Sequence, residues 1–161
     1  MKLRRTGRPR AGITLMEMLV VLALVSLLAG ITYPSVTAGL DSLRLSSATS
    51  RVVTFFNAAM NRAERRRQVV ELTIVPSESL LRLLSTEPGF HRELKLEDGV
   101  RIVKVLPELI MADEGPRRFY FHPGGTPPRA GILLRGQRGP ARLVRVDPMT
   151  GVPRVETLEE P

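Results

Sequence analysis

Glu17 is the residue of this sequence most clearly suited to a chemical role, because it is an acid inside a long apolar run. The run extends from Gly12 to Pro34 and reads GITLMEMLVVLALVSLLAGITYP. Moving an unpaired carboxylate into hydrocarbon costs several kcal/mol, so an acid at this place requires a partner. As a helix, residues 13–33 would be roughly 30 Å long, which matches the hydrocarbon core of a bilayer. We therefore expect a membrane-spanning helix with a functional acid near its start.

A basic leader precedes the apolar run and sets its expected orientation. Residues 1–12 contain five Lys or Arg and no acid, so they carry +5 of the formal charge of +8 and leave +3 for the remaining chain. Basic residues beside a membrane span stay in the cytoplasm. The rest of the chain is then expected to be exported. It has no cysteine, so an exported domain must be held together by its apolar core alone.

Three interpretations of the N-terminus are open. An ordinary secretory signal has a shorter apolar region and a small-residue cleavage site. The candidate cleavage site here, near Ala29 and Gly30, would remove the helix. A plain signal anchor explains the length of the run but gives Glu17 no role. In the third interpretation the chain is cut before the helix, and the helix stays in the mature protein.

The third interpretation follows a resemblance. The sequence Gly12-Ile13-Thr14-Leu15-Met16-Glu17 resembles the class III signal of type IV pilins and type II secretion pseudopilins. The resemblance implies that a prepilin peptidase cleaves between Gly12 and Ile13 and that the new N-terminal Ile13 is N-methylated. It places Glu17 at the fifth mature position, where the family has its glutamate. It places Pro34 at the twenty-second, where many members have a helix-kinking proline. Phenylalanine is the common first mature residue, and isoleucine here is a departure.

Cleavage at that bond would create a free amine one helical turn from Glu17. In an assembled fibre, the amine of one subunit would neutralise the carboxylate of its neighbour. Such a pair attracts strongly in a low-dielectric core, but desolvation offsets much of the gain, so the pair would set register more than stability. Alternatively, Glu17 is an interfacial acid favoured by the helix dipole. That alternative predicts that substitutions of Glu17 are tolerated.

The helical pattern continues beyond Pro34 at steps of three and four residues. The recurring apolar residues are Leu45, Ala48, Val52, Phe55, Phe56, Ala59 and Ala63. This spacing predicts an amphipathic helix whose apolar stripe faces a core. We expect one helix from about Thr14 to Arg66. Residues 13–36 would form its transmembrane and assembly part, and the helix would continue to about residue 67 within a head that comprises residues 37–161.

From residue 68 the pattern changes to short β-branched segments separated by Gly, Pro and Asp turn signals. The expected strands are Val69–Val75, Ser79–Leu84, Arg92–Leu96, Val100–Val105, Arg118–Phe121, Gly131–Arg135, Arg142–Val146 and Val152–Val155. Strands of this length and spacing predict antiparallel pairing. Together with the resemblance, they predict an α+β, type IV pilin-like fold, in which a long N-terminal helix packs on an antiparallel β-sheet head.

Three C-terminal segments extend the resemblance. They are Phe121-His122-Pro123-Gly124-Gly125, Gly131-Ile132-Leu133-Leu134 and Asp147-Pro148-Met149-Thr150-Gly151. In this order they are similar to the C-terminal pattern of type II secretion minor pseudopilins of the H (GspH/FimT-like) family, a pattern also found in FimT-like minor type IV pilins. Each segment alone is also explained by turn chemistry, since Pro-Gly and Thr-Gly close hairpins in many sheets.

The sequence offers little chemistry for catalysis. It has no P-loop, dinucleotide-binding or nucleophile-elbow pattern. Its two histidines, His91 and His122, lie far apart without a spaced set of metal ligands. Asp147 fits a local turn cap better than a calcium ligand. We therefore expect no enzymatic activity, no metal and no cofactor.

The arginines of this chain suggest an anionic partner, either an acidic protein surface or DNA. Arg62 and the run Arg65–Arg67 are explained by favourable charge at a helix C-terminus, although a contact patch for an acidic neighbour is an alternative. Arg135 and Arg138 lie beside glycines in a loop that could bind DNA phosphates, and Arg142 follows them. In FimT-like minor pilins a basic C-terminal region binds DNA for uptake. Nearby glutamates dilute the charge in this chain.

The resemblance implies a minor pseudopilin that is a structural subunit of the type II secretion pseudopilus. Such a protein crosses the bacterial inner membrane once, with its head in the periplasm, and helps to export folded proteins across the outer membrane. Its partners would be the prepilin peptidase, the inner membrane and other pseudopilins in a hetero-oligomeric fibre. The first alternative is a FimT-like minor type IV pilin for DNA uptake or pilus assembly, and only there would DNA be a partner. An anchored periplasmic enzyme is the second alternative.

Overall fold

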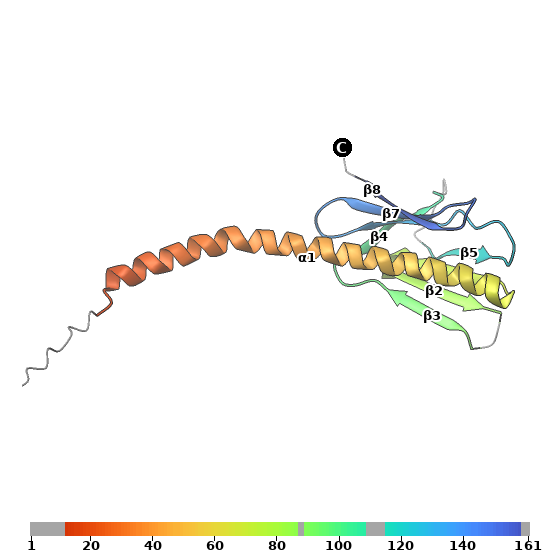
Figure 1. The fold of residues 1–161 in the computed structure, drawn as a ribbon, viewed down its shortest axis with the longest axis horizontal. Helices are drawn as coiled ribbons and strands as arrows, with labels where there is room; N and C mark the ends of the chain where they lie inside the picture. Colours follow the sequence, from red (N-terminus) through yellow and green to blue (C-terminus); the bar gives the residue numbers. More distant parts are fainter. Residues whose placement is uncertain (1–11, 87–88, 109–114, 159–161) are drawn as a thin grey trace, which may run out of the picture. The chain divides into compact units, whose positions relative to one another are not determined.

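The computed structural model describes residues 12–86, 89–108 and 115–158. Apart from Gly12, the leader therefore lies outside the described residues. The chain divides into two compact units between Thr37 and Ala38. Helix α1 (Leu15–Arg66) is 52 residues long and runs through this division (Figure 1). The expected helix from about Thr14 to Arg66 is thus confirmed.

The first unit is an apolar helical segment. Its stretch Leu15–Tyr33 is long and apolar enough to cross a membrane, and none of its residues is buried. The hydroxyls of Ser26 and Thr32 donate hydrogen bonds of 2.8 Å to the carbonyl oxygens of Leu22 and Leu28. Polar groups in hydrocarbon must be satisfied within the protein, and these two are satisfied within α1 itself. The segment is therefore suited to a lipid environment.

The second unit, the head, contains eight strands in its described residues. They are β1 (Val70–Val75), β2 (Leu80–Ser85), β3 (His91–Lys95), β4 (Arg101–Leu106), β5 (Arg117–Phe121), β6 (Gly131–Arg135), β7 (Ala141–Val146) and β8 (Pro153–Leu158). A short 3-10 helix, Pro76–Glu78, joins β1 to β2. All eight expected strands are present. The main difference is β8, which continues to Leu158 instead of ending at Val155.

The strands form two antiparallel sheets of four strands each. Their orders are β3-β2-β1-β5 and β4-β6-β7-β8. The chain crosses between the sheets before β4, before β5 and before β6. The sequence predicts antiparallel pairing but not this division, because the pairing of β1 with β5 joins strands that no local turn connects. The α+β, pilin-like layout itself agrees with the expectation.

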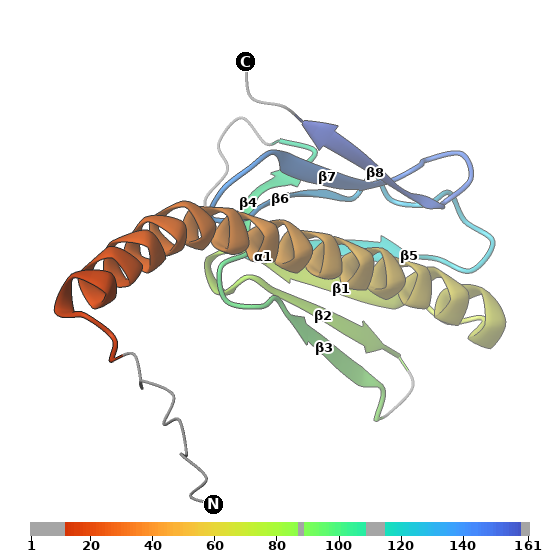
Figure 2. The same cartoon turned by 60° about the vertical axis from the view of Figure 1, so that its left-hand side comes forward.

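The core of the head lies between α1 and the inner faces of both sheets. All seven residues of the expected apolar stripe of α1 are buried, from Leu45 to Ala63. Side chains alternate between the faces of a strand, so every second residue points inward. Leu72 and Ile74 of β1 and Ile132 and Leu134 of β6 are completely buried in this way. Figure 2 shows the head segment of α1 in front of the two sheets.

Candidate processing and assembly site

Thr14 caps the start of α1. The backbone N–H of Glu17 donates a hydrogen bond of 3.2 Å to the Thr14 hydroxyl, and the N–H of Met18 donates one of 3.2 Å to the Thr14 carbonyl. A threonine followed three residues later by glutamate is the pattern of a capping box, in which the acid belongs to the first turn. The pattern is visible in the sequence, although it was not among the expected features. The cap fixes the point at which the helix begins.

The bond between Gly12 and Ile13 lies just outside this cap. Both residues are exposed and neither is helical. A side-chain carbon at Gly12 would meet no other group within 4 Å. Cleavage between them would leave Thr14 and the helix intact, with Ile13 as the residue directly before the cap. The structure is therefore compatible with the processing that the sequence predicts.

Glu17 lies in the first turn of α1 and is exposed. It is the sole charged residue between Gly12 and Leu40. The positive end of the helix dipole favours an acid here. The structure thus brings Gly12, Ile13 and Glu17 together at the start of α1. Pro34 belongs to the same helix but lies roughly 25 Å further along its axis.

The three arginines considered for nucleic-acid contacts do not share one face. Arg135 ends β6 and lies opposite Arg101 of β4, whereas Arg138 lies in the turn between β6 and β7. Arg142 of β7 lies opposite Leu134, which points into the core. Directly opposed residues share a face, and successive residues alternate. Arg135 and Arg142 therefore project to opposite sides of the sheet.

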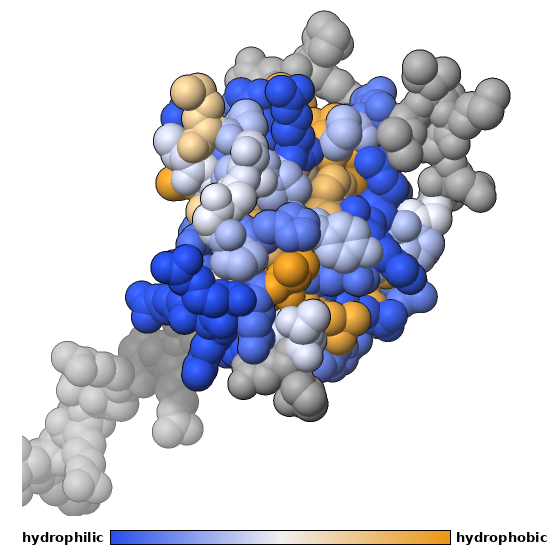
Figure 3. Space-filling view, turned by 90° about the vertical axis from the view of Figure 1, so that its right-hand side faces the viewer, coloured by the Kyte–Doolittle hydropathy of each residue, from blue (hydrophilic) through white to orange (hydrophobic). Residues whose placement is uncertain are grey.

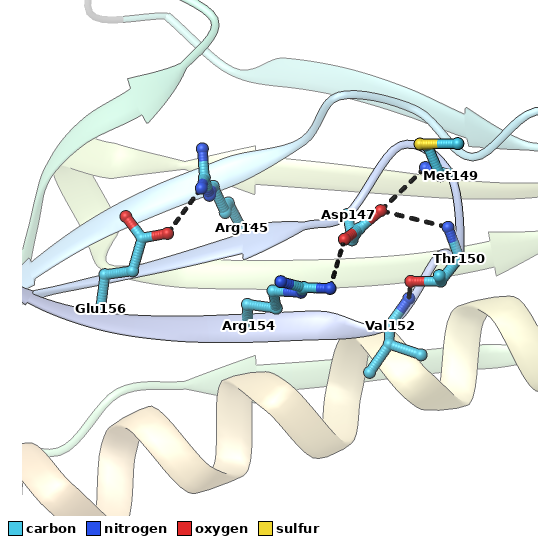
Figure 4. A network of polar contacts seen from close by, with 7 residues as sticks. All are labelled: Arg145, Asp147, Met149, Thr150, Val152, Arg154 and Glu156. Atoms are coloured by element: carbon cyan, nitrogen blue, oxygen red, sulfur yellow. Dashed lines mark hydrogen bonds and ion pairs between the residues drawn. The ribbon is translucent and has the colours of Figure 1, made fainter.

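The Asp147–Gly151 turn joins β7 to β8 and is held by Asp147 (Figure 4). One carboxylate oxygen, Oδ1, accepts hydrogen bonds of 2.9 and 3.1 Å from the N–H groups of Met149 and Thr150. The other oxygen lies 2.9 Å from Nη2 of Arg154. The interpretation of Asp147 as a turn cap is confirmed. The two backbone hydrogen bonds contribute most to holding the pKa of Asp147 below its usual value, and the positive charge of Arg154 adds to their effect.

Replacing Asp147 should change how stability depends on pH. The pKa of Asp147 is lower in the folded than in the unfolded chain, so its charge stabilises the fold above the unfolded pKa. This contribution is lost as the pH falls through the lowered folded pKa. Asp147→Asn keeps an oxygen for the turn but removes the charge. We expect Asp147→Asn to lower Tm at neutral pH, with a gap to the wild type that narrows in acid. A gap independent of pH would contradict this role.

Substitution of Gly151 should destabilise the head more than substitution of any other residue in the same turn. Its φ of +71° favours glycine. A side-chain carbon there would meet the flexible end of Met60, which can move aside, and would lie 3.0 Å from Cγ of the rigid Pro127 ring. We expect Gly151→Ala to lower the free energy of unfolding by about 2 kcal/mol. Gly139→Ala is the matched control, because Gly139 has a φ of +88° but open space around it. It should cost only about 1 kcal/mol, and equal costs in chemical denaturation would show that the contact with Pro127 adds nothing to the cost of the backbone conformation.

The two histidines lie in separate places. Nε2 of His91 on β3 is 3.1 Å from Glu93. His122 lines an open cavity of about 320 Å³ with Met60 and Glu64, and Glu64 accepts a hydrogen bond of 2.9 Å from the N–H of Gly124. Among the residues that the structure describes, no group of three or more His, Asp or Glu could hold a metal ion. Figure 3 views the head from the end at which α1 stops and shows a mainly hydrophilic surface with small apolar areas.

Comparison with known proteins identifies the N-terminal segment. Residues 7–33 match the prokaryotic N-terminal methylation motif. Neither a curated protein nor a solved structure matches the chain. The motif implies processing by prepilin peptidase and assembly with other pilin subunits, and the apolar helix is consistent with single-pass anchoring in the inner membrane. The segment containing Gly12, Ile13 and Glu17 therefore indicates a type IV pilin-like or pseudopilin protein.

Proposed function

We propose that this chain is a minor pseudopilin of the H type, a structural component of type II secretion that helps to export folded proteins across the outer membrane. The observation that carries the proposal is the arrangement at the start of α1. The Gly12–Ile13 bond, where we expect cleavage, lies beside a helix cap, and Glu17 follows in the first turn of an apolar helix. The protein would act by assembly and would catalyse no reaction.

Assembly would use the exposed apolar surface of the first unit. In the membrane its large side chains contact lipid, and in a fibre they would contact the same surfaces of neighbouring subunits. Van der Waals packing between such helices is not selective along the axis, so it leaves their register undefined. The Ile13 amine of one subunit, paired with Glu17 of the next, would define that register. The head, in the periplasm, would contact other minor subunits.

The C-terminal segments support the H-type assignment over a generic pilin. Phe121 is buried at the end of β5, and Gly124 has a φ of +65° in the following loop. Gly131 starts β6, where a side-chain carbon would lie 3.3 Å from the Val144 carbonyl oxygen. The Asp147–Gly151 turn then closes the hairpin to β8. Each segment therefore has a definite structural task, and the three follow one another along the chain in the order that the resemblance implies.

One observation favours a FimT-like minor pilin as the second candidate. Arg135 faces Arg101 across β4 and β6, and Arg145 faces Arg154 across β7 and β8. Like charges placed directly opposite each other attract anions, which relieve their repulsion. Asp147 and Glu156 are such anions for the second pair. In this alternative, DNA phosphates would be further anions that bind beside Arg135 and Arg138.

A deletion strain separates the two candidates. If the proposal holds, loss of the chain stops export of folded proteins and leaves DNA uptake unchanged, and the wild-type gene restores export. The full chain should then give no salt-sensitive gel shift with duplex DNA. A shift that is lost in Arg135→Ala/Arg138→Ala, together with a defect in DNA uptake, would instead support the FimT-like function. Export that is normal without the chain would reject the proposal.

A further inference from the structure

The last strand of the head has an open pairing edge. Among the described residues, β8 pairs only with β7. The Asp147 N–H donates a hydrogen bond of 3.1 Å to the Val152 carbonyl. Asp147 and Val152 are therefore a hydrogen-bonded pair, one position beyond the pair Val146 and Pro153 that ends the β7–β8 ladder. Hydrogen-bonded pairs alternate along an antiparallel ladder, so Arg154 and Glu156 bond to β7. The N–H and C=O groups of Val155 and Thr157 therefore point away from β7, toward the open edge.

Pro153 belongs to the same outward-pointing set of residues. Proline has no N–H to donate, and within sheets it is found where that group would face solvent. Its position supports the assignment of the open edge. It also limits the pairing, because Pro153 is buried and has no N–H to offer to an added strand. The useful edge is therefore formed by Val155 and Thr157.

Apolar side chains run along this edge. Ile132, Val144 and Val155 form one row across β6, β7 and β8. Ile132 and Val144 are 0% exposed, but Val155 is 45% exposed. Val152 and Leu158, at the two ends of the segment, are also exposed. In the part of the chain that the structure describes, the apolar row thus reaches the edge of the sheet at a half-exposed Val155, and another strand would continue it.

The charges beside Val155 specify what such a strand should carry. Arg154 lies 2.9 Å from Asp147, and Glu156 forms an ion pair of 2.6 Å with Arg145 (Figure 4). An antiparallel strand centred on Val155 would place one residue opposite Arg154 and another opposite Glu156. An acid at the first position and a base at the second would extend both ion pairs across the new edge. Read from its own N-terminus, the added segment would be basic, then apolar, then acidic.

We propose that β8 binds an extended segment of a partner protein as an additional antiparallel strand with this basic–apolar–acidic order, flanked by apolar residues. The partner is not another subunit of the same fibre. Figures 1 and 2 both show β8 running lengthwise along the head segment of α1. If a second copy of the chain added its β8 antiparallel to this one, the head segments of the two α1 helices would point in opposite directions. The subunits of one fibre would instead point in the same direction. Main-chain hydrogen bonds would give affinity, and the two charges would give specificity.

The chain itself supplies the probe. Its residues 151–158, Gly-Val-Pro-Arg-Val-Glu-Thr-Leu, have the required order, because β8 is complementary to itself when antiparallel. We expect this peptide, fluorescently labelled, to bind saturably to the full chain in nanodiscs, as measured by anisotropy. A peptide with Arg and Glu exchanged places like charges opposite Arg154 and Glu156. It should bind about tenfold more weakly.

Two variants at one position test the mode of binding. Val155→Pro removes an N–H that points to the open edge, so it should leave the β7–β8 ladder and Tm nearly unchanged but abolish peptide binding. Val155→Thr keeps the N–H and the branched side chain and should retain binding. NMR should also show slower amide exchange at Val155 and Thr157 when the peptide is bound. Absence of binding, equal binding of both peptides, or wild-type binding by Val155→Pro would each overturn the proposal.

Discussion

Glu17→Leu should insert into the membrane normally and yet fail to enter fibres. Insertion depends on the length and hydropathy of Leu15–Tyr33, and the substitution keeps the length and raises the hydropathy. In the proposed assembly, the charge of Glu17 neutralises the amine of a neighbouring Ile13, and leucine cannot supply that charge. An amine left unpaired in the packed core would be costly, so we expect loss of nearly all fibre incorporation. The measurement is the amount of the variant in sheared fibres relative to the membrane fraction.

Glu17→Gln separates the charge from the helix cap. Glutamine at this position keeps the backbone N–H that donates to the Thr14 hydroxyl. Its amide oxygen can also accept a hydrogen bond from the Thr14 N–H, as the acid of a capping box does. If the charge matters, Glu17→Gln fails to assemble, as Glu17→Leu does. If only the cap matters, Glu17→Gln assembles and Glu17→Leu does not. Normal incorporation of both variants would show that Glu17 is the interfacial acid of the alternative interpretation.

Gly12→Leu should leave the chain as unprocessed precursor. The residue before the cut has to enter a peptidase cleft, and glycine presents no side chain to obstruct it. Gly12 is exposed and lies outside α1, so neither Gly12→Leu nor the smaller change Gly12→Ala disturbs the helix. We therefore expect most of Gly12→Leu to retain its leader, whereas Gly12→Ala is processed to a much larger extent. Electrophoretic mobility of the membrane-bound chain gives the ratio. Equal processing of the two variants would count against this cleavage site.

The elements of the head could be predicted because their signals are local. The stripe from Leu45 to Ala63 has helical spacing, and all of its residues are buried. Turn residues bound the strands, so the positions of all eight strands could be read from the sequence. The end of β8 was missed because Glu156 and Thr157 are polar, and an edge strand can carry polar residues on both faces. Local patterns thus locate strands but underestimate those at an edge.

Relations between distant residues could not be predicted. The division into two sheets depends on β5 pairing with β1 rather than with its neighbour in the chain, and no local signal specifies that choice. The opposite faces of Arg135 and Arg142 follow from the register of β6 and β7, which the sequence does not state. In contrast, the capping role of Thr14 was available from the Thr14–Glu17 spacing alone. The prediction of the processing site also rests on a local pattern, Gly12 followed by Ile13 and Glu17.

The exact mass of the mature polypeptide tests the assembly mechanism most directly. The chain should be purified from membranes and its N-terminal peptide fragmented by mass spectrometry. We expect a chain that begins at Ile13 and carries a single methyl group on its amine. A mature chain that still carries residues 1–12 would have no amine at Ile13 to pair with Glu17, and it would contradict the mechanism.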